Sequence, residues 1–250
     1  MRTMTALILR EMATRYGRNP GGYVWALLEP LGVIVILSFG FALMLRAPPL
    51  GNAFLLFYAT GYLPFVMFQK TARMVMNALN FSRALLRYPA VTWIDTVFAR
   101  AVLNILTDLL VAYILLGAIL IVLETAVTLD FVPIIVGFAM MALLGTGVGL
   151  LNCAVQGLFP VWGTIWGVVT RPLMLASAVL WIWRDLPPMA QDILWWNPLI
   201  HAVALVRSGF YATFDPYHVS SLYVLGFGMG TMALGLLLLR RHHLEILSRR

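Results

Sequence analysis

Hydrophobic residues in this chain fall into six long runs, and most polar residues gather in the segments between them. A transmembrane α-helix needs about 20 predominantly apolar residues to cross the hydrocarbon core of a bilayer. The runs are close to this length or longer, which predicts an all-α membrane protein built as one transmembrane domain. We predict membrane-spanning helices at residues 24–45, 53–69, 97–123, 131–158, 164–183 and 219–239.

The composition supports a membrane protein. Hydrophobic residues make up 62% of the chain and charged residues only 11%, whereas soluble domains have about 25% charged residues. The charges are too few to cover a water-exposed surface. Cys153 is the only cysteine, so no intrachain disulfide can form, and we interpret this residue as a small packing residue.

Lysine and arginine gather on alternate sides of the predicted spans. Both terminal segments and the second loop are rich in them, the first loop has only Arg46, and the third and fourth loops have none. The positive-inside rule then predicts an even number of crossings with both termini in the cytoplasm. The net charge of +7 therefore reflects topology and attraction to anionic lipid headgroups, and we expect no nucleic-acid partner. The N-terminus lacks the short apolar core of a secretory signal.

The N-terminal segment before the first span, residues 1–22, is moderately amphipathic. Met4, Ile8, Met12 and Tyr16 share one side at helical spacing. The segment is either an anchor lying on the inner leaflet or a docking surface for a cytoplasmic partner. A glycine-rich break at residues 17–22 should end this helix.

The second loop, residues 70–96, is long and basic. Residues 81–89 favour a short helix along the membrane that ends at Pro89, and Asp95 is placed to cap the third span. Asp130 with Pro133 should start the fourth span, and Phe159 with Pro160 should end it.

The fifth loop, residues 184–218, is too apolar for a solvated linker and too short for another crossing. Its second half favours a helix of about four turns, capped by Asn197 with Pro198 at the first helical position. We predict that residues 186–214 form a re-entrant helix pair on the outer side, covered by protein. Asp215 and Pro216 should cap the last span.

Four ionisable residues lie inside the predicted spans: Glu29, Arg100, Asp108 and Arg171. Each costs on the order of 2.5–3.5 kcal/mol at the centre of a membrane helix. They either pair with one another and reach the inner interface, or at least Arg171 faces a polar path and meets an anionic substrate. Pro172 should kink the fifth span.

Small and aromatic residues suggest two further features. Glycine pairs with GxxxG spacing at residues 145/149, 163/167 and 226/230 favour packing within one chain over a dimer interface. An aromatic belt explains most tryptophans, but the outer group is dense enough to stack on sugar rings. That group is Trp181, Trp183, Trp195 and Trp196.

Several function classes are disfavoured. Lys70 is the only lysine and no glycine-rich phosphate loop precedes it, so the chain cannot supply a Walker-type ATPase. His, Cys and carboxylate residues lack metal-site spacing, and the paired Asp-rich motifs of membrane prenyltransferases are missing. The two halves differ in loop length, unlike an inverted-repeat transporter. We expect no catalytic residue, metal or cofactor in this chain.

Three segments resemble one known family. Residues 23–31, preceded by Arg15 and Tyr16, resemble the entry to the first helix of type-2 ABC transporter permeases. Residues 85–95 with Ala99 and Arg100 resemble the coupling-helix loop of that family, and residues 197–211 resemble its last segment before the final helix. The resemblance points in particular to permeases that export capsular polysaccharide, O-antigen and teichoic acid.

The resemblance implies a homodimeric permease of the bacterial inner membrane, working with two copies of a separate ABC ATPase that binds ATP and magnesium. The cargo would be a lipid-linked, usually acidic polysaccharide, and periplasmic and outer-membrane export proteins are further expected partners, besides membrane lipid. Residues 1–22 would be the interface helix, 81–92 the coupling helix and 186–214 the periplasmic gate.

These expectations assign three groups of candidate residues. The ATPase-coupling interface would contain Arg10, Arg15, Arg83, Leu86, Arg87, Tyr88 and Asp95. The translocation path would contain Glu29, Arg100, Asp108, Arg171, Trp181 and Trp183. The periplasmic gate would contain Trp195, Trp196, Asn197, His201 and Arg207.

Three alternatives stay open: a permease for a small molecule or lipid, an integral-membrane enzyme acting on lipid-linked sugars, and a non-transporting scaffold. The enzyme would need a cluster of carboxylates or histidines at one membrane face, which the sequence does not offer.

Overall fold

The computed structural model describes residues 2–16, 22–88, 91–123 and 128–248. Throughout these ranges the secondary structure is helical, which confirms the predicted all-α class. The helices are α1 (Arg2–Tyr16), α2 (Gly22–Met44), α3 (Phe54–Met76), α4 (Ala78–Ser82), α5 (Trp93–Val122), α6 (Phe131–Leu158), α7 (Trp162–Ala176), α8 (Pro188–Leu194), α9 (Pro198–Ser208) and α10 (Ser221–Ser248), with short 3-10 helices η1 (Leu85–Arg87) and η2 (Trp183–Asp185).

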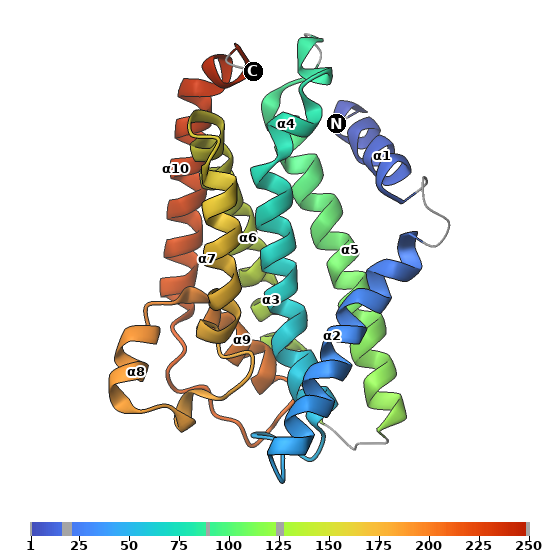
Figure 1. Cartoon of the computed structure of the whole chain (residues 1–250), viewed down its shortest axis with the longest axis vertical. Coiled ribbons are helices and arrows are strands. Elements are labelled where there is room, and N and C mark those ends of the chain that lie inside the picture. Colours follow the sequence, from blue (N-terminus) through green and yellow to red (C-terminus); the bar gives the residue numbers. More distant parts are fainter. Residues whose placement is uncertain (1, 17–21, 89–90, 124–127, 249–250) are drawn as a thin grey trace.

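The long helices lie side by side in one bundle, with α3 near its centre (Figure 1). Helix α3 packs against α2, α5, α6 and α9, and it is buried along most of its length, from Leu56 to Met76. Both chain termini lie at one end of the bundle, beside α1 and α4, which we call the proximal end. The opposite end, where α8 lies, is the distal end.

Four helices of the described chain are long and apolar enough to cross a membrane: α2, α5, α6 and α10. They coincide with the predicted spans 24–45, 97–123, 131–158 and 219–239. Helix α3 carries Gln69, Lys70 and Arg73 in its second half, and α7 has only 15 residues, fewer than the about 20 that a crossing needs. Crossing by α3 and α7 therefore stays a prediction.

Two helices continue past the predicted ends of their spans. Helix α3 continues to Met76, beyond residue 69, and α10 continues to Ser248, beyond residue 239. A helix satisfies its own backbone hydrogen bonds whether its side chains are apolar or charged. The first charged residue therefore marks where the apolar surface ends, and the helix runs on.

Helix capping confirms two predictions and corrects two others. Asp130 Oδ1 accepts a hydrogen bond from the Val132 amide at 3.0 Å, and Asn197 Oδ1 accepts one from the Leu199 amide at 3.1 Å. Asp95 does not cap α5. Thr92 is the cap, and Asp95 completes a capping box three residues later, with reciprocal bonds of 3.2 Å to the two backbone amides.

The last span does not begin at Asp215 and Pro216. Residues 216–219 form a turn closed by the Val219 amide on the Pro216 carbonyl at 2.9 Å. The Ser220 hydroxyl then accepts from the Tyr223 amide at 3.4 Å, so Ser220 caps α10, which begins at Ser221.

Glycines set the distance between helices, although not all of those predicted. A Cβ on Gly149 would lie 2.7 Å from Val75 of α3, which supports packing within the chain. Gly226 and Gly230 have no neighbour within 4 Å, so their predicted packing role within this chain was wrong. The contact between α6 and α10 depends instead on Gly147 and Gly235, where a Cβ would meet backbone atoms at 2.6 Å.

We predict that Gly147→Leu lowers the thermal unfolding midpoint of the purified protein in detergent. The new side chain would collide with the Gly228 carbonyl, and overpacking of this kind costs about 1–3 kcal/mol. Gly230→Leu is the matched control because it points into open space. Equal midpoints for the two variants would contradict the close contact between α6 and α10.

Candidate functional site

A polar cleft of about 390 Å³ opens near the proximal end between α3 and α7, beside the end of α6. Helix α3 contributes Arg73, with Asn77 directly after the helix, and α6 contributes Gln156. The first two turns of α7 form the other wall, from Gly163 to Gly167. That wall combines the small residues Gly163, Thr164 and Gly167 with the indole of Trp166.

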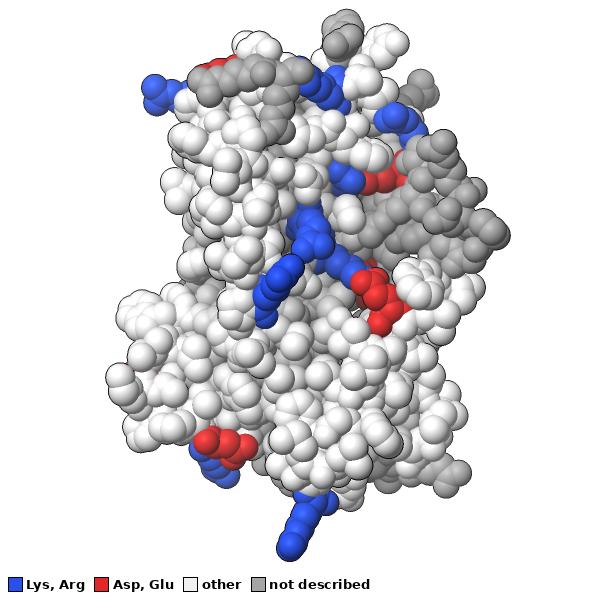
Figure 2. Space-filling view, viewed as in Figure 1, with Lys and Arg blue, Asp and Glu red and all other residues white. Residues whose placement is uncertain are grey.

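Helical spacing extends this cleft into a basic strip. Lys70 lies three residues before Arg73 on α3, and Arg171 lies four residues after Gly167 on α7, so each shares a helix face with a residue of the cleft. Arg73 and Arg171 are exposed. Figure 2 shows lysine and arginine side chains across the middle of the face in view, with acidic side chains directly beside them.

Glu29 lies beside this strip. Its Oε2 accepts from Lys70 Nζ at 2.9 Å, and the Glu29 side chain keeps 52% of its surface exposed. The pair joins α2 to α3. Two of the predicted path residues, Glu29 and Arg171, therefore have exposed side chains.

Two other predicted path residues lie elsewhere. Asp108 is inside the bundle, where its Oδ2 accepts from Asn104 Nδ2 at 2.7 Å, and Asn104 also donates to Thr71 of α3 at 3.0 Å. Arg100 lies at the proximal end, where its Nε donates to Glu11 Oε1 at 2.7 Å. Neither residue lines the cleft, and their role in a path stays a prediction.

The segment predicted as a coupling helix, residues 81–92, is not one helix. It contains the end of α4 and the 3-10 helix η1, and Pro89 lies outside the described residues. Leu86 packs against the core cluster that includes Val75 and Leu79, whereas Tyr88 is 64% exposed.

The other predicted coupling residues lie on the same end. Arg83 donates from Nη2 to the Leu247 carbonyl of α10 at 3.1 Å, and Arg10 is exposed on α1. The side chains of Arg15 and Arg87 lie outside the described residues. The proximal end thus joins α1, α4, η1 and the end of α10 into one surface (Figure 1).

At the distal end, helix α7 ends at Ala176, seven residues before the predicted end of that span at residue 183. Ala178 adopts a positive φ of 56°, a conformation that reverses the chain at helix ends and is unusual for a residue other than glycine. The break leaves several backbone carbonyls without helical partners.

Arg207 of α9 binds the carbonyls of this broken segment. It is fully buried, and it donates from Nη1 to Trp181 at 3.0 Å and from Nη2 to Val179 at 2.7 Å, with a third bond from Nη1 to Ala178 at 2.6 Å. The guanidinium also lies 4.1 Å above the Phe57 ring of α3. Arg207 therefore fixes the non-helical segment between α7 and η2, residues 177–182, against the central helix α3.

Aromatic residues and histidines fill the rest of the distal end. His201 Nε2 lies 2.8 Å from the Trp195 carbonyl, and Asn197 donates to the Ala176 carbonyl at 2.8 Å. Trp183 stacks on His218 with ring centroids 4.6 Å apart. Burial, together with the nearby His201, lowers the pKa of His218 to about 4, so this imidazole is neutral near pH 7. Trp196 is 67% exposed.

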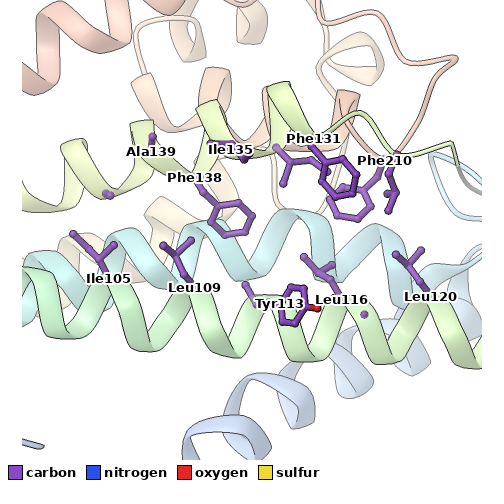
Figure 3. Close-up of a pocket in the computed structure, with 15 residues that line it drawn as sticks. Ile105, Leu109, Tyr113, Leu116, Leu120, Phe131, Ile135, Phe138, Ala139 and Phe210 are labelled. Carbon is purple, nitrogen blue, oxygen red and sulfur yellow. The ribbon is translucent and has the colours of Figure 1, made fainter.

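An apolar groove of about 730 Å³ runs between α5 and α6. Figure 3 shows Leu109, Tyr113 and Leu116 of α5 facing Phe138 and Ile135 of α6 across it. Its lining offers no charged group, so it cannot orient a charged cargo.

Sequence patterns did not indicate the positions of Lys70, Arg73, Glu11 and His218 in these sites. Lys70 and Arg73 were counted as loop charges, although their spacing with Asn77 continues a helical face. Glu11 received no role, and nothing local in the sequence indicates its pairing with a residue 89 positions away. No motif surrounds His218, so nothing local in the sequence indicates that it stacks on Trp183. Among the described residues, no cluster of three His, Cys, Asp or Glu side chains could hold a metal ion.

This all-helical bundle of candidate membrane spans, with a basic cleft and a broken distal segment, has the features of a membrane transport subunit. The chain belongs to the ABC-2 type transporter family, whose model matches residues 2–211.

Known relatives match almost the whole chain. It is 29% identical over 248 residues to the polysialic acid transport protein KpsM of Escherichia coli, covering 98% of this chain and 95% of that protein. It is 28% identical over 244 residues to the capsule polysaccharide export inner-membrane protein BexB of Haemophilus influenzae, covering 96% and 90%. It is 27% identical over 242 residues to the capsule polysaccharide export inner-membrane protein CtrC of Neisseria meningitidis, covering 96% and 91%.

We predict that Arg207→Met strongly destabilises the protein. Methionine keeps an apolar stem but leaves the carbonyls of residues 178, 179 and 181 without their donor, at about 1–3 kcal/mol for each buried group left unpaired. Thermal unfolding in detergent measures the change. Arg184→Met, an exposed arginine at the same end, is the control, and equal midpoints for the two variants would contradict the role given to Arg207.

Proposed function

We propose that this chain is the membrane-spanning permease subunit of an ATP-driven ABC exporter, and that it moves an acidic, lipid-linked capsular polysaccharide across the bacterial inner membrane. The observation that carries the proposal is the nearly full-length similarity to KpsM, BexB and CtrC, whose names describe polysialic acid transport and capsule polysaccharide export. The chain supplies the conduit, and a separate ATPase supplies the energy.

The need for a separate ATPase follows from the residues present. A Walker site requires a phosphate-binding lysine within a glycine-rich loop, and the single lysine, Lys70, lies within α3. Lys70 is instead bound to Glu29 of α2. The absence of a Walker lysine supports the proposal that another chain hydrolyses the nucleotide.

The proximal end is the proposed docking surface for the ATPase. The positive-inside rule supports a cytoplasmic position for this end, because its described helix ends carry Arg10, Arg83, Arg240 and Arg241. Exposed Tyr88 and Phe81 offer apolar contacts between these charges. The distal end would then face the periplasm, with α8, α9 and residues 177–182 as the gate.

The basic strip along the cleft is the proposed entry to the path. Arg73 lines the cleft, and Arg171 is exposed one helical turn beyond Gly167 of the cleft wall. Guanidinium groups bind carboxylates and phosphates through paired hydrogen bonds. An acidic polysaccharide or a phosphate linking it to lipid would match this charge.

A second copy of the chain would close the path. The face of α7 next to the cleft exposes Ile165, Val168 and Leu175, and α7 makes few contacts within this chain apart from those with α6. Pairing of two copies across this face would enclose the two basic strips between them, as a homodimeric permease requires.

We predict that Arg171→Gln lowers export in a reconstituted or complemented exporter by about tenfold or more, since a hydrogen bond to a charged group contributes about 1.5–3 kcal/mol. Arg171→Lys should retain part of the activity because it keeps the charge. Arg184→Gln removes a distal charge outside the cleft and should export normally. Normal export by Arg171→Gln, at a normal level of assembled complex, would remove Arg171 from the path.

A further inference from the structure

One guanidinium group of α5 at the proximal end contacts three other helices. Arg100 of α5 donates from Nε to Glu11 of α1 at 2.7 Å and from Nη1 to the carbonyl of Asn77 at 3.1 Å, where α3 ends. Its Nη2 lies 3.6 Å from the Met74 sulfur of α3, and its Cζ lies 4.2 Å above the Phe81 ring of α4. Arg100 thus links α1, α3, α4 and α5.

The link is dry. The side chains of Arg100 and Glu11 keep only 8% and 9% of their surface exposed. Removing two charges from water is costly, and their mutual attraction often does not offset that cost. Apolar residues of the same volume therefore often stabilise a protein equally well or better. A packed apolar contact would hold α1 against α5 equally well, so stability alone does not account for this pair.

The geometry of the pair differs from that of an apolar contact in one respect. Apolar side chains can slide past one another at small cost, whereas a guanidinium with a fixed fork of donors loses its hydrogen bonds when any partner moves. A displacement of α4 would move Phe81 and the end of α3. The Arg100 guanidinium contacts both, and it also binds Glu11 of α1.

We propose that Arg100 and Glu11 form a latch that makes the proximal parts of α1, α3, α4 and α5 move as one body when the ATPase displaces the segment from α4 to η1. Arg100 and Glu11 are positioning residues for transport in this proposal, which rests on the proposed function. The latch transmits motion from the docking surface to α3, the helix that carries Lys70 and Arg73.

The test compares ATP hydrolysis with export in proteoliposomes containing the permease and its ATPase. Arg100→Lys keeps a charge for Glu11 but lacks the fork that reaches Asn77 and Met74. Glu11→Gln removes the ion pair between Arg100 and α1, and Phe81→Leu removes the aromatic ring of α4 that Arg100 contacts. Arg184→Lys, at an exposed distal arginine that lies outside the docking surface and the cleft, is the matched control.

We expect each latch variant to hydrolyse ATP while exporting less per ATP. The ratio of export to hydrolysis should fall about fivefold or more, the lower end of coupling between linked sites. The control should keep the wild-type ratio, and Glu11→Arg combined with Arg100→Glu should regain part of it.

An unchanged ratio would overturn the latch, because a purely structural role lowers both activities together with the amount of assembled complex. If Arg100→Lys fails to assemble, the ratios of Glu11→Gln and Phe81→Leu decide the question in the same way. Failure of the proposed function gives a different result: the wild-type protein itself would then show no export that depends on the ATPase.

Discussion

A charge or a broken backbone inside a bilayer has to find its partners within the protein, because lipid offers none. The two ends of this bundle meet that constraint with the same chemical group. Arg207 binds three carbonyls where the chain breaks after α7, and Arg100 binds a carboxylate and a carbonyl where α3 ends. The planar fork of arginine suits both positions, since it can reach several acceptors on different segments at once.

The charges that the protein leaves exposed are informative for the same reason. Arg73 and Arg171 lie on open surfaces next to a polar cleft, Arg73 on the central helix α3 and Arg171 on the largely exposed helix α7. Groups of this kind are costly at membrane depth unless they face water, a partner or a cargo. The buried pair of Arg100 is proposed to transmit motion between helices, whereas the exposed Arg171 is proposed to meet an acidic glycan.

Much of the fold could be predicted from the sequence because apolarity is a local property. Four long apolar runs became α2, α5, α6 and α10, and the caps at Asp130 and Asn197 needed only neighbouring residues. The end of α7 could not be predicted, because it depends on Arg207 binding carbonyls up to 29 positions away. The partner of Arg100 was equally hidden, and Lys70 and Arg73 were misplaced in a loop because α3 continues past its apolar part.

The orientation of the bundle relative to the ATPase tests the proposed mechanism most directly. In a Cys153→Ala background, Tyr88→Cys at the proximal end and Trp196→Cys at the distal end each provide a single thiol on an exposed position. We expect a short bifunctional reagent to cross-link Tyr88→Cys, and not Trp196→Cys, to the ATPase subunit in the assembled exporter. Cross-linking through Trp196→Cys alone would place the ATPase at the distal end. That result would contradict the proposed transmission of motion from α4 through Arg100 to the cleft.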